Sequence, residues 1–260
     1  MGVRTLTRNV LRPGYFRTMA HKLYLRTRYR RRELREAPVA TAWAAEQAED
    51  MDTWATGLDA ALWREAKEAG EAFRAGAQPR LRELLDKGVD LGGGAAYELL
   101  YFVTRLRRPE HVLETGVAAG WSTAAVLAAI ARNGRGHLSS SDFPYFQLDD
   151  PGRYVGLLVP DELRGPWTLH LDGDRRNLPR ILGEGMVIDV AHYDSDKTAS
   201  GREFFYETVA PKLSDDAVVV MDDIGDNLWF RDRVAAERPT RVFTYRDEVY
   251  DDKYVGVIGL

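Results

Sequence analysis

The second half of the chain alternates short apolar runs with amphipathic segments. Runs with the length and residue types of strands cover residues 111–115, 136–141, 167–171, 186–192, 217–221, 241–245 and 254–259. Between them, apolar positions at helical spacing predict helices over residues 121–133, 174–183, 198–212 and 226–237. Strands that alternate with helices predict an α/β fold, in which a mostly parallel, doubly wound sheet of seven strands carries helices on both faces.

The last two predicted strands are joined differently from the others. The segment DEVYDD, at residues 247–252, is rich in turn-forming residues and too short to hold a crossover helix. We therefore expect residues 241–245 and 254–259 to pair as an antiparallel C-terminal hairpin at one end of the sheet.

The first ninety residues show no strand pattern. Residues 40–88 place Ala, Trp and Leu at helical spacing, which predicts two or three helices. Three consecutive glycines at 92–94 interrupt the chain before an amphipathic helix at 95–107. We therefore divide the chain into a basic, helical region at 1–90, which serves as a lid or in oligomerisation, and a sheet domain at 91–260.

Charge is distributed unevenly along the chain. The full sequence has a net charge of −4, but residues 1–35 hold eleven Arg and Lys against one acid, which leaves −14 on the remainder. A basic segment of this kind can bind nucleic acid, an anionic lipid surface or an acidic face of a sister subunit. Aromatic residues within it, at Tyr15, Phe16, Tyr24 and Tyr29, favour packing against protein, so we expect a homo-oligomer rather than a nucleic-acid partner.

The amino-acid composition indicates a globular protein and excludes sites that depend on cysteine. Hydrophobic residues make up 45% and charged residues 29% of the 260 positions, as is usual for a globular protein. The absence of cysteine excludes disulfides, thiolate catalysis and cysteine-ligated zinc or iron–sulfur sites. No apolar run approaches the roughly 20 residues of a membrane span, and no secretory signal follows the basic N-terminus, so we expect a cytoplasmic protein.

A glycine-rich turn follows the predicted strand at 111–115. The sequence LETGVAAGWS places Glu114 at the end of the strand, Gly116 and Gly120 in the turn, and Ser122 at the start of the next helix. Glycines permit a sharp turn and a close approach of the backbone to a ligand, and the free N–H groups at the helix start attract an anion. The spacing matches neither the G-x-G-x-x-G dinucleotide fingerprint nor a P-loop.

An acid beside this turn suits a ligand that carries both an ammonium group and a carboxylate. Glu114 would receive the ammonium group and the helix start the carboxylate, as for the amino-acid end of S-adenosylmethionine (SAM). Two further acids follow later strands. Asp142, after the second strand, is placed for ribose hydroxyls, and Asp174, after the third, can contact adenine, cap the following helix, or do both. A purely structural turn is the alternative.

Carboxylates also follow the fourth and fifth predicted strands. Asp194 comes after the strand at 186–192, and Asp222 and Asp223 come directly after the strand at 217–221. Because the carboxyl ends of parallel strands meet at one edge of the sheet, we expect these acids to converge near the glycine turn. Carboxylate oxygens suit Mg²⁺, Mn²⁺ or Ca²⁺. Acids at strand ends also cap helices, which is the alternative for this group.

Taken together, the motifs resemble those of class I SAM-dependent methyltransferases, which have a Rossmann-like sheet. Residues 90–260 look like the divalent-metal-dependent O-methyltransferases of the catechol and caffeoyl-CoA type and their bacterial natural-product relatives. The resemblance implies that LETGVAAGWS binds SAM, that Asp194 and Lys197 of a D-x-x-K motif supply a metal ligand and a lysine base, and that Asp222 and Asp223 supply two more ligands. It also implies Mg²⁺ as a cofactor and a small-molecule hydroxyl group as the methyl acceptor.

One position departs from the family pattern. Asp223 stands where the family usually has a neutral amide. Three carboxylates around a dication leave the site at −1, which disfavours a bound phenolate or alkoxide and keeps sugar acceptors open beside catechols. His192 is a rival to Lys197 as the base, because strand alternation places it on the same face as Asp194.

Three other functions compete with this prediction. A metal-independent SAM methyltransferase would use the same glycine turn, with the acids as helix caps. A nucleic-acid or membrane-surface binding protein would use the basic segment at 1–35, and its binding to nucleic acid would depend steeply on salt. A nicotinamide oxidoreductase also carries an acid after its second strand, but its glycine spacing differs.

Overall fold

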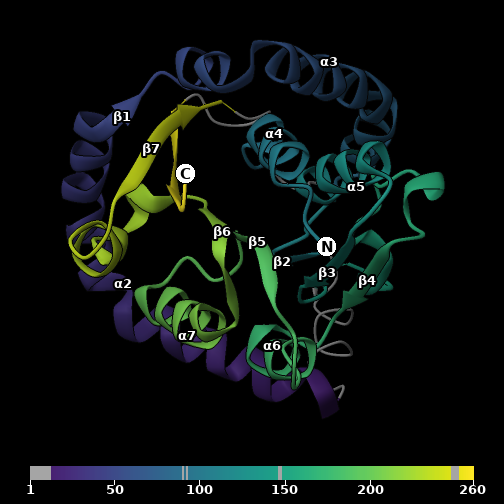
Figure 1. The fold of residues 1–260 in the computed structure, drawn as a ribbon. Coiled ribbons are helices and arrows are strands. Elements are labelled where there is room, and N and C mark those ends of the chain that lie inside the picture. Colours follow the sequence, from purple (N-terminus) through teal and green to yellow (C-terminus); the bar gives the residue numbers. More distant parts are fainter. Residues whose placement is uncertain (1–12, 90, 92, 146–147, 247–251) are drawn as a thin grey trace.

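The structure is a computed structural model of the chain and describes residues 13–89, 91, 93–145, 148–246 and 252–260 (Figure 1). Its helices are α2 (Pro13–Gln47), α3 (Met51–Asp86), α4 (Tyr97–Arg107), α5 (Trp121–Asn133), α6 (Asp174–Ile181) and α7 (Ala199–Val209). Its strands are β1 (Ala48–Glu49), β2 (His111–Thr115), β3 (His137–Ser141), β4 (Trp167–His170), β5 (Ile188–Tyr193), β6 (Leu213–Met221), β7 (Thr240–Tyr245) and β8 (Lys253–Ile258). Short 3₁₀ turns lie at Pro151–Tyr154, Asp161–Leu163, Ala210–Lys212 and Ile224–Asp226, and a π-helical turn at Phe230–Ala235.

The strands form one sheet in the order β1-β7-β8-β6-β5-β2-β3-β4. Strand β8 runs antiparallel to its neighbours β6 and β7, and the other neighbouring pairs are parallel. The predicted mostly parallel sheet with a C-terminal hairpin is therefore confirmed, although residues 247–251 of the linking segment lie outside the described residues. The hairpin is not at the very end of the sheet as predicted, because β1 pairs with β7 and forms the edge. The prediction of seven strands was one short, because β1 has only two residues and cannot produce an alternating pattern.

Helices cover both faces of the sheet (Figure 1). Helices α4 and α5 pack on one face, in an apolar cluster that includes Val112 of β2 and Val190 of β5. Helices α6 and α7 pack on the other, in a cluster that includes Leu113 and Ala191 of the same two strands. Neighbouring residues of one strand thus point into opposite cores, which explains why the strands read as continuous apolar runs.

Two long helices, α2 and α3, are separated by β1 and run around the sheet (Figure 1). Helix α2 packs against the 3₁₀ turn Ile224–Asp226, where Thr41 Oγ1 donates a hydrogen bond to the carbonyl oxygen of Gly225 at 3.2 Å. Helix α3 packs on α4 and α5 and has non-helical backbone at Asp59. The basic segment is thus helical from Pro13 onward. None of the described helices combines the length and apolar character that crossing a membrane requires.

Helix α5 has the predicted bounds, but the helix predicted at residues 226–237 takes another form. For residues 226–237 the pattern predicts an α-helix, but the structure has a 3₁₀ turn followed by a π-helical turn at Phe230–Ala235. Phe230 and Val234 are both buried in the core. The apolar residues that led to the helix prediction are therefore buried, but by a shorter and wider turn.

Candidate functional site

The glycine turn connects β2 to α5 and lies against the loop after β5. Gly116 (φ +85°) and Gly120 (φ +103°) have backbone conformations that favour glycine. A Cβ atom on Gly116 would lie 2.3 Å from the carbonyl oxygen of Asp194, so the turn also excludes a side chain there. The Asp194 N–H donates to the carbonyl oxygen of Thr115 at 2.8 Å. The predicted cofactor turn and the first predicted metal ligand are therefore in main-chain contact.

We expect Gly116→Ala to destabilise the fold by roughly 2–5 kcal/mol, because the clash with Asp194 adds to the cost of a left-handed conformation. Gly185→Ala is the matched control. Gly185 also has a positive φ (+77°), but nothing lies within 4 Å of its Cβ position, so about 1–2 kcal/mol is expected. Urea unfolding measures both losses. Equal losses at the two positions would show that the contact with Asp194 does not constrain the turn.

Glu114 lies beneath the glycine turn. Its carboxylate is fully buried and accepts hydrogen bonds from Ser122 Oγ at 2.6 Å, Thr123 Oγ1 at 2.7 Å and Ser140 Oγ at 2.7 Å. These hydroxyls come from the first turn of α5 and from β3, so Glu114 fastens both elements to β2. The contacts of Glu114 and Ser122 with SAM stay predictions.

Asp142 holds the glycine turn from the end of β3. Its Oδ2 accepts hydrogen bonds from the main-chain N–H groups of Val117 at 3.0 Å and Ala118 at 2.7 Å. Ala118 has a φ of +47°, which is uncommon for a residue with a side chain, and the bonds to Asp142 offset part of that cost. Asp142 therefore shapes the turn, in addition to its predicted contact with ribose.

Asp174 is the first residue of α6, and the N-cap position belongs to Gly173. The alternative in which Asp174 caps this helix is therefore wrong. Its carboxylate accepts hydrogen bonds from Ser141 Oγ at 2.6 Å and from Ser195 Oγ. Because Ser195 adjoins Asp194, Asp174 links the end of β3 to the loop that carries the first predicted metal ligand.

The structure brings Asp194, Asp222 and Asp223 together, with one carboxylate oxygen of each within 4.8 Å of the others. Asp222 is fully buried, while the side chains of Asp194 and Asp223 are about one-fifth exposed. Asp223 has φ 51° and ψ 40°, a left-handed conformation that Asp and Asn tolerate better than most residues. The N-cap of α7 is Thr198, whereas Asp223 occupies the N-cap position of the 3₁₀ turn Ile224–Asp226 without a side-chain capping hydrogen bond.

Two lysines neutralise most of the charge of this acid cluster, Asp194, Asp222 and Asp223. Lys197 Nζ forms ion pairs with Asp194 Oδ1 and, at 2.7 Å, with Asp223 Oδ2. Lys253 Nζ lies 3.4 Å from Asp222 Oδ2 and 3.1 Å from Asp223 Oδ1. Each carboxylate of the cluster therefore has at least one ammonium partner.

Sequence reasoning missed Lys253, Tyr245 and Arg202. Lys253 and Tyr245 are cross-strand partners in the β7–β8 hairpin, so their side chains share a face, and the Tyr245 hydroxyl donates to Asp222 Oδ1 at 2.5 Å. Arg202 is buried and donates to the carbonyl oxygens of Asp222 at 2.9 Å and Asp223 at 2.7 Å. The first two residues reach the cluster through the register of the hairpin, which the sequence alone does not reveal.

Burial and the two lysines act on Asp223 in opposite directions. Burial alone would raise its pKa, but the ammonium groups of Lys197 and Lys253 outweigh that effect and hold the pKa below the usual range of an aspartate. For nearby Asp226, burial and the charge of Asp223 raise the pKa. The two lysines thus favour the ionised form of Asp223, one of the predicted ligands.

The rival base, His192, lies deeper in the sheet. It pairs in register with Glu114, is only 1% exposed, and has its Nδ1 3.8 Å from Glu114 Oε1. Neither of its ring nitrogens has a hydrogen-bond partner within the described part of the chain. The Lys197 side chain is 33% exposed, which makes Lys197 the better placed of the two to reach a substrate.

The donor set of the acid cluster fits a hard dication. It consists of three carboxylates, without histidine or cysteine. The carboxylates lie at the carboxyl ends of β5 and β6, on the edge of the sheet that carries the glycine turn. Because Lys197 and Lys253 contact the same oxygens, a bound dication has to share or displace those contacts.

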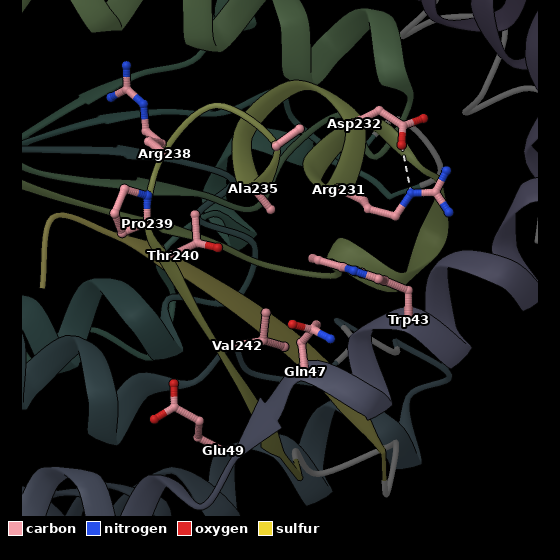
Figure 2. A pocket seen from close by; sticks show the side chains of 11 residues that line it. Trp43, Gln47, Glu49, Arg231, Asp232, Ala235, Arg238, Pro239, Thr240 and Val242 are labelled. Carbon is pink, nitrogen blue, oxygen red and sulfur yellow. Dashed lines mark hydrogen bonds and ion pairs between the residues drawn. The ribbon is translucent and has the colours of Figure 1, made fainter.

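A cavity of about 550 Å³ lies elsewhere, beside β1 and β7 at one edge of the sheet. Figure 2 shows it between the end of α2, which contributes Trp43 and Gln47, and the segment that contains Arg231 and Thr240. Arg231 is paired with Asp232 beside it. None of the residues predicted to bind SAM or a metal lines this cavity, so it is separate from the candidate site.

Comparisons with known sequences agree with this geometry. A family described as a methyltransferase domain matches residues 113–224. That range runs from β2 through the glycine turn to the residue after the acid cluster. No curated protein matches the sequence significantly.

Solved structures share the fold. The O-methyltransferase TomG from Streptomyces achromogenes, involved in tomaymycin synthesis and solved with SAM, is 13% identical with a TM-score of 0.53, over 87% of this chain and 98% of that one. An O-methyltransferase from Bacillus cereus in complex with SAH is 12% identical with a TM-score of 0.51, over 84% and 100%. A putative caffeoyl-CoA O-methyltransferase from Staphylococcus aureus is 14% identical with a TM-score of 0.51, over 70% and 91%. Residues 113–224 therefore match a methyltransferase domain, and the chain shares its fold with these solved O-methyltransferases, as the sequence motifs predicted.

Proposed function

We propose that this chain is a SAM-dependent O-methyltransferase that uses a divalent cation, with Mg²⁺ as the first candidate, to methylate a hydroxyl group of a small molecule. The observation that carries the proposal is the contact between two sites, in which Gly116 of the glycine turn abuts Asp194 of the acid cluster. A methyl donor in the turn and an acceptor at the cluster would therefore be neighbours. Catechols, sugars and other vicinal diols of natural-product pathways are the acceptors that suit two-point binding at a dication.

On the donor side, the turn and the start of α5 would hold the amino-acid end of SAM. Glu114, Gly116, Gly120 and Ser122 form this end of the site, and the acids after β3 and β4 border the nucleoside end. SAM supplies the electrophilic methyl group. The left-handed glycines and the free N–H groups of the helix start are the features that support this placement.

On the acceptor side, Asp194, Asp222 and Asp223 would hold the dication, which when bound lowers the pKa of the acceptor hydroxyl and fixes its orientation. Lys197 accepts the hydroxyl proton at Nζ as the neutral amine, after its ammonium group has released a proton to solvent, which the charge of a bound dication would favour. Its partial exposure and its contacts to two of the three carboxylates support this role. Transfer then yields the methyl ether and S-adenosylhomocysteine.

A metal-independent methyltransferase is the second candidate, because Lys197 and Lys253 already contact all three carboxylates. In that enzyme the lysines balance the charge of the cluster, and EDTA leaves the activity unchanged. The third candidate, a nucleic-acid or membrane-surface binding protein, depends on residues 1–35 alone. Homo-oligomerisation through the first ninety residues and a cytoplasmic location likewise stay predictions.

Calorimetric titration with SAM and with S-adenosylhomocysteine, each with and without Mg²⁺, separates these candidates. We expect the wild type to bind both nucleosides and to show a separate Mg²⁺ isotherm. The double variant Asp194→Asn/Asp222→Asn should keep SAM binding and lose the Mg²⁺ isotherm, because two of three anionic ligands are gone. Asp161→Asn, which alters a fully exposed acid, is the control and should retain both.

The other outcomes decide against the proposal in different ways. SAM binding without any Mg²⁺ isotherm would favour the metal-independent enzyme. Failure of the folded wild type to bind SAM would overturn the methyltransferase proposal altogether. Salt-sensitive nucleic-acid binding that disappears when residues 1–35 are deleted would then support the third candidate.

A further inference from the structure

Lys253 occupies a place in the acid cluster that the proposed reaction does not require. Its side chain is 15% exposed, and its Nζ lies 3.1 Å from Asp223 Oδ1 and 3.4 Å from Asp222 Oδ2. Lys197, the proposed base, contacts the other oxygen of Asp223. The two ammonium groups therefore divide the cluster between them, and only one of them is assigned a chemical role.

The hairpin fixes Lys253 in this position. Lys253 is the first residue of β8 and lies opposite Tyr245 of β7. Its Nζ is 5.3 Å from the centroid of the Tyr245 ring, within the range of a cation–π contact, and the hydroxyl of the same tyrosine is bonded to Asp222. The strand, the aromatic ring and the two carboxylates therefore hold the Lys253 side chain in a defined position.

We propose that Lys253 is a built-in counter-cation for the third carboxylate, Asp223, and that it sets the affinity of the acid cluster for the divalent cation. This inference rests on the proposed function. Three carboxylates and two ammonium groups leave the cluster at −1, and a dication brings it to +1. Without Lys253 the cluster would be at −2 and would become neutral on binding a dication.

This charge balance has two opposite consequences. Lys253 contacts oxygens of Asp222 and Asp223 that a dication needs as ligands, and it repels the dication, so it weakens metal binding. Once a dication is bound, Lys253 makes the site one charge unit more positive than it would otherwise be, which favours the acceptor as an oxyanion. Lys253 thus offsets the extra negative charge that Asp223 adds to a site of this kind.

Titration of the SAM-free protein with Mg²⁺ alone tests the inference. We expect Lys253→Met to bind Mg²⁺ roughly tenfold more tightly or better than the wild type, because one repulsive charge and one competitor for the ligands are removed. Lys253→Arg keeps the charge and should stay within about threefold of the wild type. Lys212→Met, which alters a partly exposed lysine outside the cluster, is the matched control and should leave the affinity unchanged.

A double variant identifies Asp223 as the partner of Lys253. In Asp223→Asn/Lys253→Met one negative and one positive charge are lost together, so the cluster returns to −1 and its Mg²⁺ affinity should return close to that of the wild type. Thermal unfolding and SAM titration establish that each variant is folded. If Lys253→Met does not fold, Asp223→Asn with Lys253 intact provides the reverse test, with weaker Mg²⁺ binding expected.

Two negative results have different meanings. If the wild type binds Mg²⁺ and Lys253→Met binds it equally or more weakly, the counter-cation role is overturned and the proposed function stands. If neither protein binds Mg²⁺ although both bind SAM, the metal-dependent reaction fails, and the inference about Lys253 fails with it.

Discussion

Replacement of Lys197 by methionine is expected to lower kcat by roughly 10²–10⁴-fold while leaving SAM binding intact. The Nζ atom of Lys197 contacts Asp194 and Asp223, so it lies where an acceptor hydroxyl would be deprotonated in the proposed reaction. Formation of S-adenosylhomocysteine, with catechol or another vicinal diol that the wild type methylates, measures the effect. Lys212→Met is the control and should leave kcat unchanged.

Lys197→Arg separates the two roles that a lysine can have in this position. Arginine keeps the positive charge beside Asp194 and Asp223 but does not accept a proton near neutral pH. If Lys197 is the base, the arginine variant loses nearly as much activity as the methionine variant. A wild-type kcat in Lys197→Arg would show that the residue acts as a fixed charge and that another group takes the proton.

The convergence of the three acids was predictable because it depends only on topology. Apolar runs defined β5 and β6, and in a parallel sheet the residues after both strands must meet at one edge. Asp194, Asp222 and Asp223 follow those strands directly, so no knowledge of side-chain packing was needed. The same reasoning placed the glycine turn at that edge.

Features that depend on register or on side-chain direction were not predictable. Strand β1 has two residues, and its pairing with β7 exists only because α2 and α3 bring it there. Lys253 enters the acid cluster because the hairpin register sets it opposite Tyr245. The sequence also does not reveal that His192 pairs with Glu114 inside the sheet.

Substitution of the buried Glu114 is expected to have the second large effect, on both stability and SAM binding. The sequence places an acid at the end of β2, where a direct contact with the ligand is a reasonable expectation, but the structure surrounds its carboxylate with three hydroxyl groups from α5 and β3. An amide offers one acceptor oxygen in place of two charged ones. We therefore expect Glu114→Gln to lose about 2–3 kcal/mol of stability and, because α5 is then less firmly held, at least about tenfold in SAM affinity.

Urea unfolding and SAM titration of the same variant distinguish a positioning role of Glu114 from a direct contact with the ligand. Glu110→Gln is the control, since Glu110 is an exposed acid near the start of β2 that pairs with Arg135, and it should change stability by less than about 0.5 kcal/mol. A loss of both stability and SAM affinity in Glu114→Gln is the result expected of a positioning residue. A loss of SAM affinity at unchanged stability would instead mean that Glu114 binds the ammonium group of SAM directly. That result would require the carboxylate to leave its three hydroxyl partners when the cofactor binds.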